Sequence, residues 1–286
     1  MIRFVRPLAV AAVCAAAYGA TGPGRPPRGL PFGPWHLTDD QFHWPYSGTV
    51  RGPHPTDVIT TLEAARRAGF RVVFRLARGR KGFSNPDGSF NLALWKREVD
   101  RFRGVDFAPY VADGTLLGHF LFDEPHDPTN WNGRPVPYAV IESTAAYSKS
   151  LWPTLPTVIG APPTFLSGGM PWVNLDFAET QYRPKKGEVG LWLSREVAAA
   201  RQARLGVLLS INVLAGGDRN EPLTAEQLRA AGLALAPAPD ACALFMWKYD
   251  KDDPSYFARA DVRAAVDTIA RVAAARTPAP CARGRP

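Results

Sequence analysis

Strands and helices are predicted to alternate along most of this sequence, which indicates an α/β fold with a parallel sheet and outer helices. Three observations favour a single (β/α)8 barrel. Short apolar runs bounded by glycine and proline alternate with helical segments seven times along the chain. The length of 286 residues suits a barrel of about 250 residues better than an open sheet. No G-x-G-x-x-G motif follows a predicted strand, which disfavours a dinucleotide-binding sheet.

The first twenty residues indicate a secretory signal peptide. Arg3 and Arg6 precede an apolar stretch, 7–18, that is too short to span a bilayer, and a small-x-small cleavage pattern follows it. An uncleaved anchor is the alternative. We therefore expect a secreted or periplasmic protein with no stable membrane insertion after cleavage. The expected division is a signal peptide at 1–20, a Pro/Gly-rich lead-in at 21–34, the barrel at 35–276 and a C-terminal tail at 277–286.

Composition narrows the class of partner. With 46% hydrophobic residues the chain can bury a large core, and we expect a monomer. The net charge of +8 is scattered, with no Lys/Arg run interleaved with aromatics, so nucleic-acid binding is disfavoured; attraction to acidic polymers stays open. Once Cys14 leaves with the signal peptide, Cys242 and Cys281 are a pair that could form one disulfide.

The elements before the middle of the chain follow from periodicity. A first strand and its exit loop are predicted within 35–44. Apolar residues at helical spacing predict a helix over 55–68, with Gly69 as its C-terminal stop. A strand at 71–77 and a helix at 92–102 follow. One βα unit is not visible; either residues 103–115 hold it or the barrel is irregular.

The elements of the second half follow in the same way. Helix caps are predicted at Ser194 and at Thr224, which opens a capping box with Gln227. The predicted strands are 116–122, 156–162, 172–179, 206–212 and 243–249. The predicted helices are 139–151, 195–204, the segment after Thr224, and 258–275.

The strand at 116–122 organises the predicted site. It is followed at once by Asp123, Glu124 and Pro125. Because proline has no N–H to donate, the strand ends there, and both carboxylates project from its C-terminal end, where α/β folds bind ligands. The alternative is that both are solvated loop charges.

Other predicted strand ends also carry acids, arginine, amides and aromatic rings. Aromatic rings stack on the apolar faces of sugars, while carboxylates and arginine bind hydroxyl groups. This combination predicts a cleft for an oligo- or polysaccharide. The expected substrate-binding residues are Asp39, Arg75, Asp123, Asp176, Tyr182, Asn212 and Trp247. Arg75 could instead form a structural ion pair, and Trp247 could be a core residue.

Glycoside hydrolysis needs two carboxyl groups that flank the scissile bond, one of them protonated. Glu124 is the candidate acid and Glu179 the candidate partner, with Asp176 as a competitor for that role. We expect no cofactor. The histidines lack metal-binding spacings, so we expect no metal site, and no G-x-S-x-G motif supports an esterase.

The segment FDEPH at 122–126 resembles the Asn-Glu-Pro signature on the fourth strand of the large clan of retaining (β/α)8 glycoside hydrolases that includes cellulases and mannanases. The resemblance implies that Glu124 is the acid/base and that Asp123 stands where an Asn contacts the sugar 2-hydroxyl. It also implies that Arg75 supports the nucleophile and that Trp247 floors a subsite.

The sequence departs from that pattern in two places. Asp replaces Asn at position 123, and the predicted seventh strand has no Glu where the clan keeps its nucleophile. Despite these two departures, the carboxyl groups at the predicted strand ends lead us to expect a secreted glycoside hydrolase. The alternatives are a non-catalytic glycan-binding barrel and a metal-dependent hydrolase that uses His36, Asp39 and Asp123.

Overall fold

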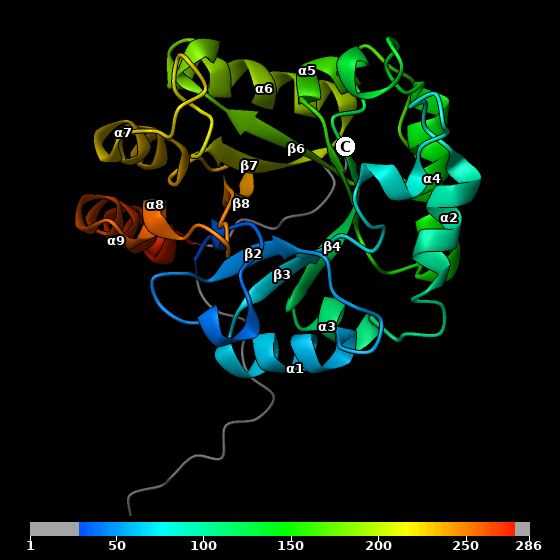
Figure 1. Ribbon diagram of the computed structural model, residues 1–286, viewed down its shortest axis with the longest axis horizontal. Coiled ribbons are helices and arrows are strands. Elements are labelled where there is room, and N and C mark those ends of the chain that lie inside the picture. Colours follow the sequence, from blue (N-terminus) through cyan, green and yellow to red (C-terminus); the bar gives the residue numbers. More distant parts are fainter. Residues whose placement is uncertain (1–28, 278–286) are drawn as a thin grey trace, which may run out of the picture.

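A computed structural model describes residues 29–277 of the chain. Its eight strands are all parallel and lie in the order β1-β8-β7-β6-β5-β4-β3-β2, with helices around them on every side (Figure 1). The strands are β1 (Phe32–Pro34), β2 (Gly48–Arg51), β3 (Arg71–Phe74), β4 (Leu116–Asp123), β5 (Thr157–Gly160), β6 (Phe177–Tyr182), β7 (Gly206–Asn212) and β8 (Ala241–Trp247). The helices are α1 (Val58–Ala68), α2 (Leu92–Asp100), α3 (Ala108–Ala112), α4 (Tyr138–Leu151), α5 (Pro163–Leu166), α6 (Val189–Ala203), α7 (Ala225–Leu235), α8 (Ser255–Ala258) and α9 (Ala260–Ala275).

The first and second strands, at the two ends of this order, are joined to each other by hydrogen bonds. The Ser47 N–H donates to Phe32 O at 2.7 Å, and the His36 N–H donates to Val50 O at 2.8 Å. Between them, the Thr49 hydroxyl donates to Pro34 O at 2.7 Å. The sheet therefore closes on itself, and the predicted (β/α)8 barrel is confirmed.

The unit that the sequence did not reveal is β2. Residues 103–115 hold the short helix α3 instead of a strand. The predicted first strand at 35–44 is wrong as well, because β1 lies earlier, inside the expected lead-in, and a 3-10 helix, η1 (Asp39–Gln41), occupies the later stretch. Both strands are only three or four residues long, too short to show an alternation of apolar and polar residues.

The strand predicted at 172–179 is displaced toward the C-terminus. Its apolar residues Trp172 and Leu175 pack in a loop on the outer side of the sheet, and β6 begins only at Phe177. The next helix also begins earlier than predicted. Glu188 caps α6 by accepting hydrogen bonds from the N–H groups of Gly190 and Leu191, both at 2.7 Å, so Ser194 lies inside the helix. By contrast, the capping box at Thr224 and the Gly69 helix stop are confirmed.

The inside of the barrel is filled by one apolar cluster. Every strand or its immediate exit contributes to it, so the barrel is a packed core rather than a pore. The cluster contains Trp35, Val50, Val73, Phe120, Val158, Phe177, Leu208, Ala243 and Phe245. This apolar layer forms the floor on which the next layer of inward-facing side chains stands.

The two ends of the described chain lie against each other. The Leu30 N–H donates to Ala273 O, near the end of α9, at 2.8 Å. Arg71 Nη2 donates to Gly29 O at 2.6 Å. Gly29 has a φ of +99°, and a Cβ there would overlap the backbone of residues 273 and 274, so only glycine fits this contact.

The predicted signal peptide, most of the lead-in and the C-terminal tail lie outside the described residues. Cys242 is disulfide-bonded, and Cys14 and Cys281 lie outside the described residues. Within residues 29–277, no helix is long and apolar enough to cross a membrane.

Candidate active site at the C-terminal end of the barrel

The side chains above the apolar floor follow from the two-residue period of the strands. Two residues beyond Val73, Val158, Phe177, Leu208 and Phe245 come, respectively, Arg75, Gly160, Glu179, Ser210 and Trp247. Alternate residues of a strand point to the same face, so these five positions face the barrel axis at its C-terminal end. The apolar floor therefore carries a polar layer.

Strand β4 reaches this layer through an irregularity. Its pairing with β5 shifts register between Phe120 and Asp123. Phe120 belongs to the cluster inside the barrel, whereas Leu121 and Phe122 belong to a second apolar cluster between the sheet and the surrounding helices. The shift therefore inserts one residue and turns Asp123 inward. A regular strand would have presented Phe122 to the cleft instead.

Asp123 and Glu179 flank a glycine in the sheet. Gly160 is the Cα partner of Asp123 on one side and of Glu179 on the other. Because the middle residue has no side chain, the Asp123 carboxyl group lies in the space above it. A Cβ at position 160 would overlap Asp123 Oδ1 and lie 2.6 Å from Phe120 Cζ. Gly160 is thus the position that admits the carboxyl group to the floor of the cleft.

Burial sets the proton affinity of this pair. It raises the pKa of Glu179 to about 8, helped by the negative charge of Asp123, while a hydrogen bond from Ser210 Oγ acts the other way. Burial also raises the pKa of Asp123 to about 7, together with repulsion from Glu124, and the Arg75 guanidinium opposes the increase. Neighbouring carboxyl groups of this kind titrate as a pair, so the pair retains a proton at neutral pH.

Glu124 stands at the rim of the same site. Its φ of 51° is in the left-handed region, where a residue other than glycine is uncommon and marks a functional-site candidate. This backbone is held by Glu124 N–H donating to Gly160 O and Trp131 Nε1 donating to Glu124 O, both at 2.8 Å. The carboxylate accepts a hydrogen bond from Asn130 Nδ2 at 2.7 Å and lies 3.7 Å from Arg80 Nη2. Its side chain is 37% exposed, against 5% for the whole residue Glu179, so Glu124 is the more accessible carboxylate.

Two further predicted residues lie beside these carboxyl groups. Arg75 follows β3 directly. Burial lowers the pKa of the Arg75 guanidinium, and the negative charge of Asp123 opposes this by favouring the charged form of Arg75. Trp247, the last residue of β8, packs edge-on against Trp35 with ring centroids 5.0 Å apart. Both line the cleft, where the sequence predicted them.

Two adjoining cavities meet at the carboxyl groups. The first, of about 280 Å³, lies over the ends of β4 to β8 and includes Glu179, Gln181, Asn212 and Lys186 in its wall. The second, of about 220 Å³, lies over the ends of β3 and β4 and includes three arginines. Asp123, Glu124 and Trp247 line both cavities. Both volumes fall below the ~300–1,000 Å³ typical of small-molecule sites, which suits a unit as small as one sugar ring.

Strand β7 ends in the amide of Asn212, at the place where the glycoside hydrolase clan that the sequence resembles has its nucleophile. Asn212 is 4% exposed; its Nδ2 donates to Gln181 Oε1 at 2.8 Å and its Oδ1 accepts from the Ala215 N–H at 2.9 Å. The other inward residues of β7 are Leu208 and Ser210. The second carboxyl group of the cleft therefore comes from β6, and it is Glu179, which accepts a hydrogen bond from Ser210 of β7.

The structure does not bring Asp176 and Tyr182 to the cleft. Asp176 precedes β6, at the opposite end of the barrel, where it accepts a hydrogen bond from the Thr157 N–H at 2.8 Å and pairs with Lys149 Nζ at 2.7 Å. Tyr182 faces outward onto Trp192 of α6, and its hydroxyl donates to Gly187 O at 2.9 Å. Both misplacements follow from the displaced register of β6.

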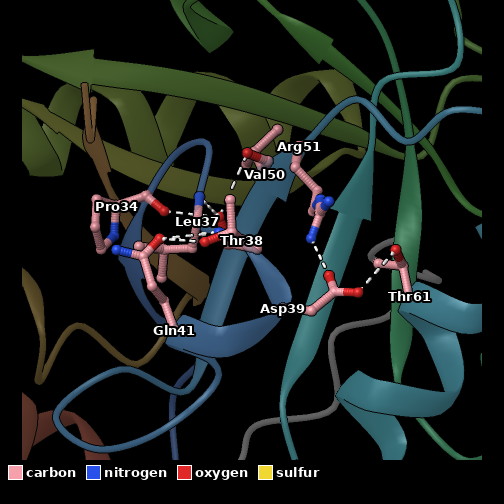
Figure 2. A network of polar contacts seen from close by, with 9 residues as sticks. Pro34, Leu37, Thr38, Asp39, Gln41, Val50, Arg51 and Thr61 are labelled. Carbon is pink, nitrogen blue, oxygen red and sulfur yellow. Dashed lines mark hydrogen bonds and ion pairs between the residues drawn. The ribbon is translucent and has the colours of Figure 1, made fainter. Parts of the chain in front are cut away.

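Asp39 also turns away from the cleft. Figure 2 shows its carboxylate between Arg51, with which it forms an ion pair, and Thr61 of α1, whose hydroxyl donates at 3.4 Å. Asp39 is therefore not available beside Asp123, as the metal-dependent alternative required. Among residues 29–277 no group of three or more His, Cys, Asp or Glu side chains is arranged to hold a metal ion.

Several residues of the cleft were missed in the sequence. Gln181, Arg183 and Lys186 were hidden because β6 was placed too early, so that its end was read at Glu179. His126 lies in the loop after β4, and Arg80 begins the 3-10 helix η2 (Arg80–Phe83) after β3. For Arg80 a signal was present, since 75–81 (RLARGRK) directly follows a buried strand.

Solved structures of glycosidases share this architecture. The chain superposes on a glucosidase from Croceicoccus marinus with a TM-score of 0.58 at 13% identity, covering 85% of this chain and 67% of that one. It superposes on Saccharomyces cerevisiae Gas2p, solved with laminaritetraose and laminaripentaose, with a TM-score of 0.55 at 15% identity, covering 82% of this chain and 56% of that one. For the β-mannanase of Alicyclobacillus acidocaldarius the TM-score is 0.53 at 11% identity, with 82% and 89% covered.

The sequence itself matches no protein-family model and no curated protein. At identities of 11–15%, the structural likeness concerns the fold, and the chain spans little more than half of Gas2p. The predicted resemblance to (β/α)8 glycosidases is thereby confirmed at the level of architecture. This chain is a (β/α)8 barrel of the kind found in glycosidases, with a cluster of carboxyl groups at the end of the barrel where such folds bind ligands.

Proposed function

We propose that the protein hydrolyses glycosidic bonds in an oligo- or polysaccharide. The observation that carries the proposal is the position of three carboxyl groups where two small cavities adjoin: Asp123 and Glu124 line both cavities, and Glu179 lies in the wall of the larger one. A glycosidic bond that joins one sugar in each cavity would cross this junction. The expected signal peptide would deliver such an enzyme, as a monomer, to polysaccharide outside the cytoplasm.

Glu124 and Glu179 are the two catalytic carboxyl groups of this proposal. The raised pKa of Glu179 suits a group that holds a proton at neutral pH, so Glu179 donates that proton to the leaving oxygen. Glu124, expected from sequence to be the acid, acts instead at the anomeric carbon, directly or by activating water. In both routes the bond between anomeric carbon and leaving oxygen breaks as Glu179 protonates that oxygen, and water supplies the new hydroxyl. In the direct route Glu124 first bonds to the anomeric carbon, and water deprotonated by Glu179 then displaces it; in the other route Glu124 takes a proton from the attacking water, and exchange with solvent restores both groups.

A second candidate function is favoured by Asn212. Because β7 ends in an amide instead of a carboxylate, the barrel could bind glycans in the same cleft without cleaving them. The two functions differ in turnover alone.

Release of reducing ends from a panel of neutral and acidic polysaccharides tests the proposal. Hydrolysis of at least one member by the wild-type protein, lost in Glu124→Gln, is the expected result. Measurable glycan binding without release from any member would favour the glycan-binding barrel. Turnover that a chelator abolishes would instead favour metal-dependent chemistry.

The pH profile is expected to depend on Asp123. With Glu179 as the acid, kcat/KM should fall on the alkaline side near the pKa of about 8. Asp123→Asn removes a negative charge that raises this pKa, so the alkaline limb should move to lower pH. The measurement is kcat/KM against pH for both proteins, with Asp106→Asn, at an exposed position outside the cleft, as the matched control. An alkaline limb that does not move in Asp123→Asn would contradict the assignment of the proton to Glu179.

A further inference from the structure

The smaller cavity is bordered by an unusually basic segment. Residues 75–81 contain Arg75, Arg78, Arg80 and Lys81, and the three arginines line this cavity. The acidic side chains in its wall are Asp123 and Glu124. One of these, Asp123, has a pKa raised to about 7 and is therefore only partly ionised at neutral pH. The wall of this cavity carries an excess of positive charge.

Arg78 is held in place by one carboxylate, which takes hydrogen bonds from only part of its guanidinium group. Its Nε and Nη2 form two hydrogen bonds to the carboxylate of Glu98, at 2.8 and 2.9 Å, while the side chain stays 67% exposed. The described residues provide no hydrogen-bond partner for its Nη1. Glu98 is a buried residue that Arg101 also holds, at 3.3 Å, so the anchor is itself well fixed. The free edge of this guanidinium is preorganised for a ligand.

Arg80 is fixed by different contacts. Its guanidinium carbon lies 5.3 Å from the ring centroid of Trp131, and its Nη1 donates to Asn130 Oδ1. The side chain is 40% exposed, and Nη2 approaches Glu124 no closer than 3.7 Å. A ligand anion in the cavity would therefore compete with a long, partly solvated ion pair, which is weak.

We propose that this cavity binds a uronic-acid residue of an acidic glycan, with its carboxylate held by Arg78 and Arg80. The inference rests on the glycan-cleaving function proposed above and narrows its substrate. A guanidinium fork matches the two coplanar oxygens of a carboxylate, and the cavity volume suits one sugar ring. Further basic groups lie along the path of a longer chain. Arg78, Arg80 and Lys81 also line an adjoining open groove, and Arg183 and Lys186 line the larger cavity.

Calorimetric titration with matched pairs of oligosaccharides tests the inference. The probes are oligomers of polygalacturonate, alginate and glucuronan, each compared with the same oligomer after reduction of its carboxyl groups to neutral hydroxymethyl groups. The Glu179→Gln protein is used so that the oligomers stay intact. We expect at least one acidic oligomer to bind about tenfold more tightly than its reduced form.

Substitutions then locate the binding. Arg78→Gln and Arg80→Gln should each weaken binding of the acidic oligomer about tenfold and leave its reduced form unaffected. Arg67→Gln removes the same charge from an exposed position on α1 and should change neither. Arg80→Gln keeps the test valid if Arg78→Gln unfolds the loop, which the melting temperature would reveal.

The outcomes separate this inference from the proposed function. Equal binding of acidic and reduced oligomers, or equal weakening by Arg67→Gln, would overturn the uronate site even if a neutral glycan is cleaved. Tighter, Arg78-dependent binding of a sulfated oligosaccharide than of any uronate would overturn the choice of carboxylate. Arg78-dependent uronate binding without turnover of any glycan by the wild-type protein would overturn the hydrolase proposal alone.

Discussion

Glu179→Gln and Glu124→Gln are each expected to lower kcat/KM on a natural polysaccharide by about 10³-fold or more. An acid or base that acts in the transition state contributes on the order of 10²–10⁴-fold, and both groups face one scissile bond in the proposed mechanism. The two variants should differ on a glycoside with a 2,4-dinitrophenyl leaving group, which departs without protonation. On that substrate Glu179→Gln should recover to within about tenfold of wild type, whereas Glu124→Gln should stay inactive.

Steady-state kinetics of the three proteins on both substrates is the measurement. Glu142→Gln is a suitable control because this buried residue holds the loop before β6 by accepting from Asn174 N–H at 2.7 Å, outside the cleft, and an amide oxygen can still accept. Recovery of Glu124→Gln instead of Glu179→Gln on the activated substrate would return the acid role to Glu124, as the sequence first suggested. Full activity of Glu179→Gln on the polysaccharide would exclude Glu179 from catalysis.

Gly160→Ala is expected to destabilise the protein by about 1–3 kcal/mol and to reduce activity strongly. The added methyl group would occupy the space that the Asp123 carboxyl group fills. It would also lie 2.6 Å from Cζ of the buried Phe120 ring. Asp123 can rotate away more easily than Phe120, which is packed in the interior layer, so the cleft should be distorted before the barrel unfolds.

Thermal melting and kcat/KM of Gly160→Ala check this prediction. Gly168→Ala provides the matched control, because a Cβ there would meet no atom closer than 3.8 Å in an exposed loop after α5. If Gly160→Ala melts like wild type and keeps full activity, the carboxyl group of Asp123 does not need the space above residue 160.

The barrel could be predicted from the sequence because its longer strands are continuous apolar runs. β4 and β7 lie where these runs predicted them, and Asp123, Glu124, Asn212 and Trp247 reach the cleft as expected. The short strands β1 and β2 escaped detection because what defines them is pairing with other strands, β8 and β3 respectively, which a local pattern does not contain.

The parts of the site that could not be predicted depend on register. Asp123 faces the cleft only because β4 gains one residue against β5, and Glu179 faces it because β6 starts at Phe177. A shift of one residue in a strand exchanges its inner and outer faces. Because the strand was predicted at 172–179 and β6 spans Phe177–Tyr182, Tyr182 was expected in the cleft in place of Gln181, and Asp176 was assigned to the wrong end of the barrel. The electrostatic coupling of Asp123 to Glu179 could not be predicted either. The two residues lie on β4 and β6 and are brought together only by their pairing with Gly160 of β5, which lies between them.

The contact between Leu30 and Ala273 has a topological consequence. Because Leu30 contacts Ala273, close to the two ends of the described chain, the eight βα units form a ring, and its opening can be moved to another loop. A circularly permuted protein, with residue 277 linked to residue 29 and new termini at the exposed turn around Gly104, should keep the same barrel once Cys242 is replaced by serine. In such a protein the carboxyl groups of β4 and β6 would remain neighbours, because their meeting depends on the closed sheet and not on where the chain begins.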